Sequence, residues 1–92
     1  MLTVEEALHR AAEFLAAESA SWESSAVRII PEDAFVERGR LIVPYDHMEY
    51  LDEGREGMRL AGNDPIAVDL ETGSPTYVSP EEAEDLMDRG LL

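Results

Sequence analysis

The sequence contains no cysteine and no lysine among its 92 residues, and it has only two histidines. Without cysteine, the chain can form no disulfide, no thiolate metal site and no cysteine nucleophile. Without lysine it lacks the usual phosphate clamp, and it has no glycine-rich phosphate-binding motif. Disulfide-stabilised domains, thiolate metalloproteins and P-loop enzymes are therefore excluded.

Long apolar runs are also missing. The acidic residues Glu5 and Glu6 stand near the N-terminus, where a secretory signal would carry basic residues. No apolar stretch approaches the ~20 residues that a membrane-spanning helix needs. We therefore expect a cytoplasmic protein with no membrane partner.

Basic side chains are scarce compared with acidic ones. Twenty-one Asp and Glu residues face seven bases, all of them arginine, and the formal net charge is −14. Such a charge repels nucleic acids and anionic membranes, and it attracts basic proteins. The same surplus would also keep a small domain soluble. Charge alone therefore leaves partner binding and solubility as equal alternatives.

The length predicts a single domain over residues 1–92. Its first element is a helix from Thr3 to about Ser19, because Thr3 and Glu6 have the spacing of a capping box. Apolar residues then recur at helical spacing; they are Val4, Leu8, Ala11 or Ala12, and Leu15.

Short segments with the composition of β-strands follow the first helix. They are residues 26–30, 34–37, 41–43, 66–70 and 76–78. Pro44 cannot donate to a strand ladder, so it indicates a strand end, an edge or a bulge. The turn Glu71–Gly73 predicts a hairpin between the last two segments, with Pro75 at an edge or bulged position.

Two further helical segments complete the chain. Residues 46–53 predict a short helical insert that ends near Gly54. A final helix begins after Ser79, with Pro80 in its first position and Glu82 completing a second capping box. Its apolar face is predicted from Ala83, Leu86 and Met87.

The fold class predicted from these segments is α+β. We expect an antiparallel sheet of about four strands, with an N-terminal helix, a short helical insert and a C-terminal helix. Short connections between strands favour antiparallel pairing. Such a sheet can bury one face under helices and leave the other in water, which predicts two layers.

Residues able to carry catalysis are few. His9 shares a helix face with Glu5 and is interpreted as half of an exposed charge pair. His47 follows Asp46 in an acidic turn, but catalytic zinc sites usually use two or more histidines. Trp22 is interpreted as an edge of the core rather than a partner contact. We predict no catalytic residues, no metal and no cofactor.

A pattern in the second half of the chain resembles a known family. The residues that carry it are Tyr50–Gly54, Leu60–Ile66, Val68-Asp69 and Thr72-Gly73. This pattern resembles the YrhB-like family, also described as immunity protein 35. The stretch Gly39–Pro44 departs from the family, because it lacks the tryptophan that members carry in this strand. The glycines, Asn63 and Pro65 suit special backbone conformations, so the motif indicates fold more than active site.

The resemblance implies a non-enzymatic immunity protein of a bacterial toxin–antitoxin pair. Such a protein binds and neutralises a cognate polymorphic toxin, here one with a basic face, and we expect a monomer or weak homodimer. The alternatives are a chaperone-like stress protein and an acidic regulatory module that binds another basic protein. Candidate partner-binding residues are the acids of the insert: Asp46, Glu49, Asp52, Glu53 and Glu56.

Overall fold

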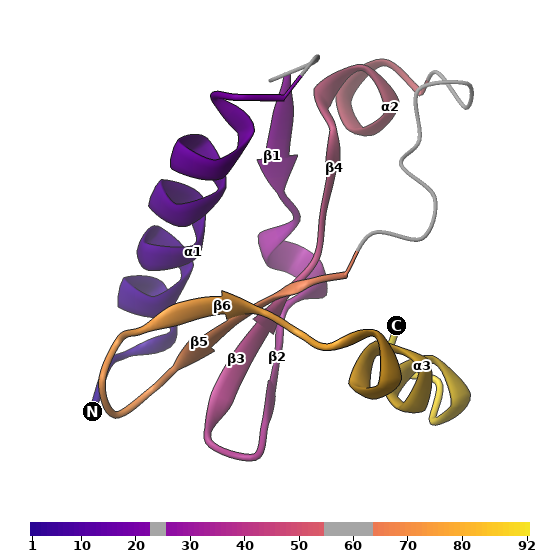
Figure 1. The fold of residues 1–92 in the computed structure, drawn as a ribbon. Helices are drawn as coiled ribbons and strands as arrows, with labels where there is room; N and C mark the ends of the chain where they lie inside the picture. Colours follow the sequence, from indigo (N-terminus) through magenta and orange to yellow (C-terminus); the bar gives the residue numbers. More distant parts are fainter. Residues whose placement is uncertain (23–25, 55–63) are drawn as a thin grey trace.

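The structure is a computed structural model that describes residues 1–22, 26–54 and 64–92. Helices α1, α2 and α3 span Val4–Ser19, Met48–Glu53 and Pro80–Asp88. Strands β1 to β6 span Val27–Ile29, Phe35–Glu37, Arg40–Val43, Tyr45–His47, Ile66–Asp69 and Pro75–Tyr77. A short 3₁₀ helix, η1, spans Pro31–Asp33. The predicted α+β class with N- and C-terminal helices around antiparallel strands is confirmed (Figure 1).

Helix α1 begins where the capping pattern predicted. The Thr3 hydroxyl accepts a hydrogen bond from the Glu6 backbone N–H, and the Glu6 carboxylate accepts one from Thr3 N–H, both at 3.1 Å. These bonds satisfy donors that a helix start leaves unpaired. The buried stripe differs from the predicted one, since Val4 is exposed. The residues of α1 that are buried are Ala7, Ala11, Leu15 and Ser19.

Strands β1 to β4 form one long antiparallel hairpin with a break in the middle. In the outer half Ile29 pairs with Tyr45, and in the inner half Phe35 pairs with Ile42. The five residues 30–34 therefore lie opposite only two, Val43 and Pro44, and the three extra residues form η1. Ile30 N–H donates to the Pro44 carbonyl at 2.8 Å, which joins the two halves across the break.

The inner half of this hairpin belongs to a four-stranded sheet of order β2-β3-β5-β6, and the outer half is a two-stranded sheet of β1 and β4. The β3–β5 ladder ends at the pair Val43 and Ile66. At this end of the ladder each strand is flanked by a proline: Pro44 comes directly after β3, and Pro65 comes directly before β5. The carbonyls of Pro44 and Pro65 accept from Ile30 N–H and Val78 N–H, but neither proline has an N–H to donate back to those neighbours.

Both faces of the central strands are buried, so the prediction of two layers with one wet face was wrong. On one face α1 and β1 cover a cluster that includes Leu41, Val43, Ile66 and Val68. On the other face α3 places Ala83 and Leu86 against Ile42, Ala67 and Val78. Figure 1 shows α1 and α3 at opposite ends of the β5–β6 pair. The wet face was expected because an antiparallel sheet can leave one face in water. Strands β3 and β5 are instead apolar at successive positions, Leu41–Val43 and Ile66–Val68, which suits burial on both faces.

Four aromatic side chains form a row on the α1 side. Trp22 lies 6.1 Å from Tyr45, Tyr45 lies 6.4 Å from Tyr77, and Tyr77 meets Phe14 edge-on at 5.1 Å between ring centroids. Trp22 packs partly buried against the core, which confirms the interpretation from sequence. Burial raises the pKa of Tyr77 to about 12, with Tyr45 and Glu18 adding to the shift. Tyr77 therefore stays neutral throughout the physiological range.

The β5–β6 turn explains part of the family pattern in physical terms. The Asp69 carboxylate accepts hydrogen bonds from the backbone N–H groups of Glu71 (2.8 Å) and Thr72 (3.1 Å). Gly73 has φ +77°, and a Cβ placed there would lie 3.3 Å from Leu2. These residues build the turn, as predicted, and β6 is an edge strand, as its proline indicated. The Leu60–Asn63 part of the pattern lies outside the described residues.

Helix α3 is held to the sheet by an ion pair as well as by its apolar face. Ser79 caps the helix by accepting from Glu82 N–H at 3.2 Å. The Glu82 carboxylate does not complete a capping box, because both its oxygens accept from the guanidinium of Arg40 on β3. This two-bonded contact lowers the pKa of Glu82 and raises that of Arg40.

Within the described residues, no helix is both long and apolar enough to span a membrane.

Replacing Glu82 with glutamine should destabilise the fold in a pH-dependent way. The folded-state pKa of Glu82 lies below its ordinary value of 4.5. The stabilisation is therefore complete above about pH 4.5 and disappears as the pH falls through the folded-state pKa. Urea unfolding should show a loss of about 1 kcal/mol for E82Q at pH 7, shrinking toward zero in acid. A loss of the same size at every pH would contradict this role.

Candidate partner-binding surfaces

The predicted partner-binding acids lie on β4 and α2, in unlike surroundings. Asp46 is only 6 % exposed, and its carboxylate accepts a hydrogen bond from the backbone N–H of His47 at 2.7 Å. Glu49 belongs to α2, and Asp52 and Glu53 are exposed in its last turn. Glu56 lies outside the described residues. Of the acids whose side chains are described, Asp52 and Glu53 thus have the exposure that a docking contact needs, and Asp46 has a structural bond.

Asp52 already has an intramolecular partner. The guanidinium of Arg28 on β1 donates two hydrogen bonds to its carboxylate, at 2.7 and 3.4 Å. The contact lowers the pKa of Asp52 and raises that of Arg28. It connects α2 to the outer sheet, although both side chains remain in contact with water. A partner that used Asp52 would therefore compete with or extend this pair.

The histidines do not assemble a metal site. Among residues 1–22, 26–54 and 64–92 no three His, Cys, Asp or Glu side chains are grouped so that they could hold a metal ion. His9 pairs with Glu13 at 3.2 Å on the exposed side of α1, one turn after His9, whereas the predicted partner Glu5 lies one turn before it. His47 keeps Nδ1 buried without a hydrogen bond. The sequence already argued against a metal site around His47. The described side chains give no reason to propose one.

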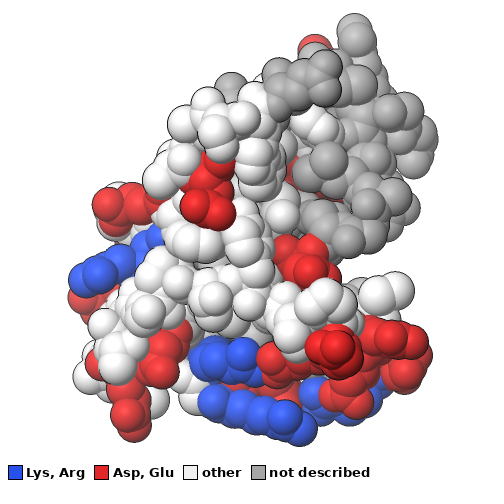
Figure 2. All heavy atoms as spheres, in the orientation of Figure 1, with Lys and Arg blue, Asp and Glu red and all other residues white. Residues whose placement is uncertain are grey.

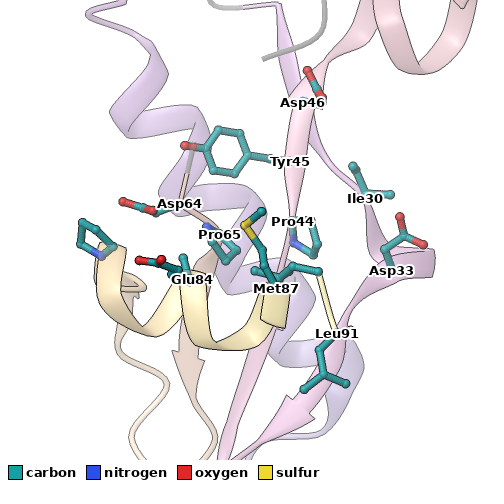
Figure 3. A pocket seen from close by; sticks show the side chains of 13 residues that line it. Ile30, Asp33, Pro44, Tyr45, Asp46, Asp64, Pro65, Glu84, Met87 and Leu91 are labelled. Atoms are coloured by element: carbon teal, nitrogen blue, oxygen red, sulfur yellow. The ribbon is translucent and has the colours of Figure 1, made fainter. Parts of the chain in front are cut away.

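A half-open groove lies where α3 approaches the break in the long hairpin. Its volume is about 780 Å³. The apolar part of its wall comes from Ile30, Pro44, Pro65, Met87, Leu91 and Leu92. Figure 3 shows Met87 rising from α3 toward Pro44 and Pro65, so that the groove joins three segments distant in sequence.

The rim of this groove is acidic. Four carboxylates line it, those of Asp33, Asp46, Asp64 and Glu84, and none of its described lining residues is basic. Figure 3 places Asp64 and Glu84 on one side of Met87 and Asp33 on the other. We call this feature the acid-rimmed groove. Only Asp46 was among the residues predicted from sequence, since the other three acids belong to separate elements.

Met87 shows why the groove was missed. The sequence places Ala83, Leu86 and Met87 on one apolar helix face, and we predicted all three as core residues. In the structure Ala83 and Leu86 are buried, but Met87 is 62 % exposed and points into the groove. Leu91 and Leu92 beyond the helix are each 41 % exposed. Helical spacing identifies the apolar face of a helix, but it does not show how much of that face the sheet covers.

Four of the described arginines, Arg28, Arg38, Arg40 and Arg89, pair with acids outside the groove. Arg40 pairs with Glu82, and Arg89 lies between Glu37 (3.4 Å) and Asp85 (3.1 Å). Figure 2 shows most of the arginine side chains of this face gathered over the β2–β3 hairpin and α3, intermixed with acids. A second hollow, lined by Arg38, Arg40 and Glu82 among others, lies in this mixed region. Within residues 1–22, 26–54 and 64–92, the groove acids Asp33, Asp64 and Glu84 form no ion pair.

Fold and site together define a small α+β domain whose described surface has an acidic, partly apolar groove and no grouped metal ligands. Comparison with protein families assigns the chain to one family. The chain belongs to the immunity protein 35 family, whose model matches residues 5–85. The match runs from the first turn of α1 into α3 and so covers nearly the whole fold.

The other comparisons add no relative. No curated protein and no solved structure matches the chain. The family match confirms the immunity protein 35 resemblance that the sequence pattern suggested. The YrhB-like part of that resemblance stays a prediction.

Replacing Asp46 with alanine should destabilise the fold more than the same change at Asp52. Removing the buried Asp46 carboxylate leaves the His47 N–H without its acceptor, which costs about 1–3 kcal/mol. Asp52 is exposed, so D52A should change the free energy of unfolding little and in a salt-dependent manner. Urea unfolding of both variants checks the order. Equal stability of D46A and wild type would show that Asp46 has no structural role.

Proposed function

We propose that this chain is an immunity protein that binds a cognate bacterial polymorphic toxin and neutralises it. The observation that carries the proposal is the family match over residues 5–85. The partner is then a protein, and neutralisation comes from occupying that protein rather than from a reaction catalysed by this chain. The net charge of −14 supports a toxin with a basic face.

We propose that two sets of residues have different roles in binding: one speeds association, and the other holds the bound partner. The acids of α2, with Glu56 beyond it, are proposed to steer a basic partner during approach, because exposed charge acts mainly on association rate. The surfaces that hold the partner afterwards need apolar contact, because charge alone contributes little at exposed positions. Exposed apolar side chains are available at Met87, Leu91 and Leu92.

A chaperone-like role is the second candidate, and the same exposed apolar residues favour it. Unfolded chains bind through apolar patches. The carboxylates beside Met87 and Leu91 restrict such binding to basic segments, which is a narrower range than a general chaperone needs. Failure of the purified chain to suppress heat aggregation of several unrelated clients would remove this candidate. A third candidate, a regulatory module for another basic protein, is favoured if affinity capture recovers a non-toxin protein.

Expression of this chain should protect cells from the toxin encoded beside its gene. Growth of cells producing that toxin is measured with and without this chain. We expect growth to be restored by this chain and not by an unrelated acidic domain of similar size and charge. Equal protection by both proteins, or by neither, would contradict the proposal.

Charge reversal on α2 should slow association with the toxin. In the triple variant E49K/D52K/E53K the association rate should fall about tenfold at low salt, because steering depends on the local field. The difference should shrink as salt rises and screens the charges. Stopped-flow or surface-based kinetics give the rate.

The matched control for this experiment is E5K/E13K/E71K, which changes the net charge equally on exposed positions of α1 and the β5–β6 turn. The control should slow association much less than the α2 variant. If the two variants behave alike, the net charge steers the partner and α2 has no special part.

A further inference from the structure

We propose that the acid-rimmed groove receives a basic, amphipathic segment of the partner protein. This inference rests on the proposed function and adds the binding site and the chemistry of what enters it. One or two apolar side chains of the segment lie against Met87, Leu91 and the two prolines. Its Arg or Lys side chains reach the carboxylates of Asp33, Asp64 and Glu84.

The apolar half of the site is open to a ligand. Met87, Leu91 and Leu92 are the exposed apolar side chains of its wall, and the half-buried Pro44 and the buried Pro65 line the wall beside them. The volume of about 780 Å³ falls within the range of sites that enclose ligands, and it accommodates a few side chains. A methionine adapts its shape to different apolar groups, so Met87 suits a surface that closes around an inserted side chain.

The charged half of the site has no counter-charge among the side chains that the structure describes. Asp33, Asp64 and Glu84 form no ion pair with any residue that the structure describes. By contrast Arg28, Arg38, Arg40 and Arg89 each pair with an acid outside the groove. Carboxylates in a partly enclosed site interact more strongly with a cation than carboxylates in open water do. Cationic side chains from a partner would therefore complement these carboxylates.

Other occupants fit less well. A second copy of this chain would bring another net charge of −14 to an already acidic rim. Nucleic acids and anionic membranes are repelled for the same reason. A purely apolar ligand would cover carboxylates without replacing their contact with water, which is unfavourable. A segment that alternates basic and apolar side chains satisfies both halves of the groove.

The test uses the whole chain, labelled with ¹⁵N, and synthetic peptides as probes. One peptide has four Arg-Leu repeats, a second has Ser in place of Leu, and a third has Glu in place of Arg. At about 0.15 M salt we expect the Arg-Leu peptide to bind most tightly and to shift the backbone amide signals of Ile30, Asp33 and Met87. The peptide with Ser in place of Leu should bind about fivefold more weakly, and the peptide with Glu in place of Arg should not bind.

Variants separate the groove from the general charge of the surface. D33N/E84Q should weaken binding of the Arg-Leu peptide about tenfold, and the matched control E5Q/E71Q less than about twofold. M87S should weaken the Arg-Leu peptide about fivefold and leave the Arg-Ser peptide unchanged. Circular dichroism melting curves confirm that each variant is folded. Equal binding of the Arg-Leu and Arg-Ser peptides, or equal effects of the two double variants, would overturn the inference.

The cognate toxin gives the last arm of the test. If wild type and D33N/E84Q/M87S release the toxin at the same rate and protect cells equally, the groove is not the binding site, while the immunity function stands. If the triple variant releases the toxin faster and the α2 variant mainly binds it more slowly, the inference is supported. If the Arg-Leu peptide occupies the groove but the toxin is not bound, the immunity function fails and the groove serves another basic partner.

Discussion

The end of the β3–β5 ladder at two prolines is the constraint on which the rest of the structure depends. Beyond the last pair, Val43 and Ile66, neither Pro44 nor Pro65 can donate a hydrogen bond to a neighbouring strand. The long hairpin leaves the four-stranded sheet at this point. It breaks at Pro44, η1 takes up the three extra residues opposite, and the outer half turns toward α1 as a separate sheet.

This break positions the features that matter for binding. It leaves Ile30, Asp33, Pro44 and Asp46 at the edge of a space that α3 approaches from the other side. It also directs Tyr45 into the aromatic row that connects β4 with β6 and α1. The groove thus lies beside the two prolines, at the end of the β3–β5 ladder.

Much of the fold could be predicted from the sequence because its signals are local. The cap at Thr3, the turn around Asp69 and Gly73, and the start of α3 after Ser79 all depend on residues within four positions of each other. Strand β4 was not predicted, because Tyr45–His47 is short and polar and its pairing with β1 is a distant contact. The helical insert accordingly begins at Met48, two residues later than predicted.

The candidate site was harder to predict for the same reason. Asp46 was selected as one of a run of acids, and the structure buries it. Asp33, Asp64 and Glu84 come together only because the chain breaks at Pro44 and α3 covers the second sheet face, and no local pattern carries that information. The exposure of Met87 likewise depends on how α3 is seated and not on its sequence periodicity.

The aromatic row has an optical consequence. Trp22 is the single tryptophan of the chain, and its ring centroid lies 6.1 Å from that of Tyr45. Tyr45 belongs both to the packed row and to the wall of the acid-rimmed groove. Energy absorbed by the tyrosine passes readily to an indole at such a separation, and the emission of the indole depends on its surroundings. The protein therefore contains its own fluorescent reporter, one ring away from the place where a partner would insert, and it needs no attached dye.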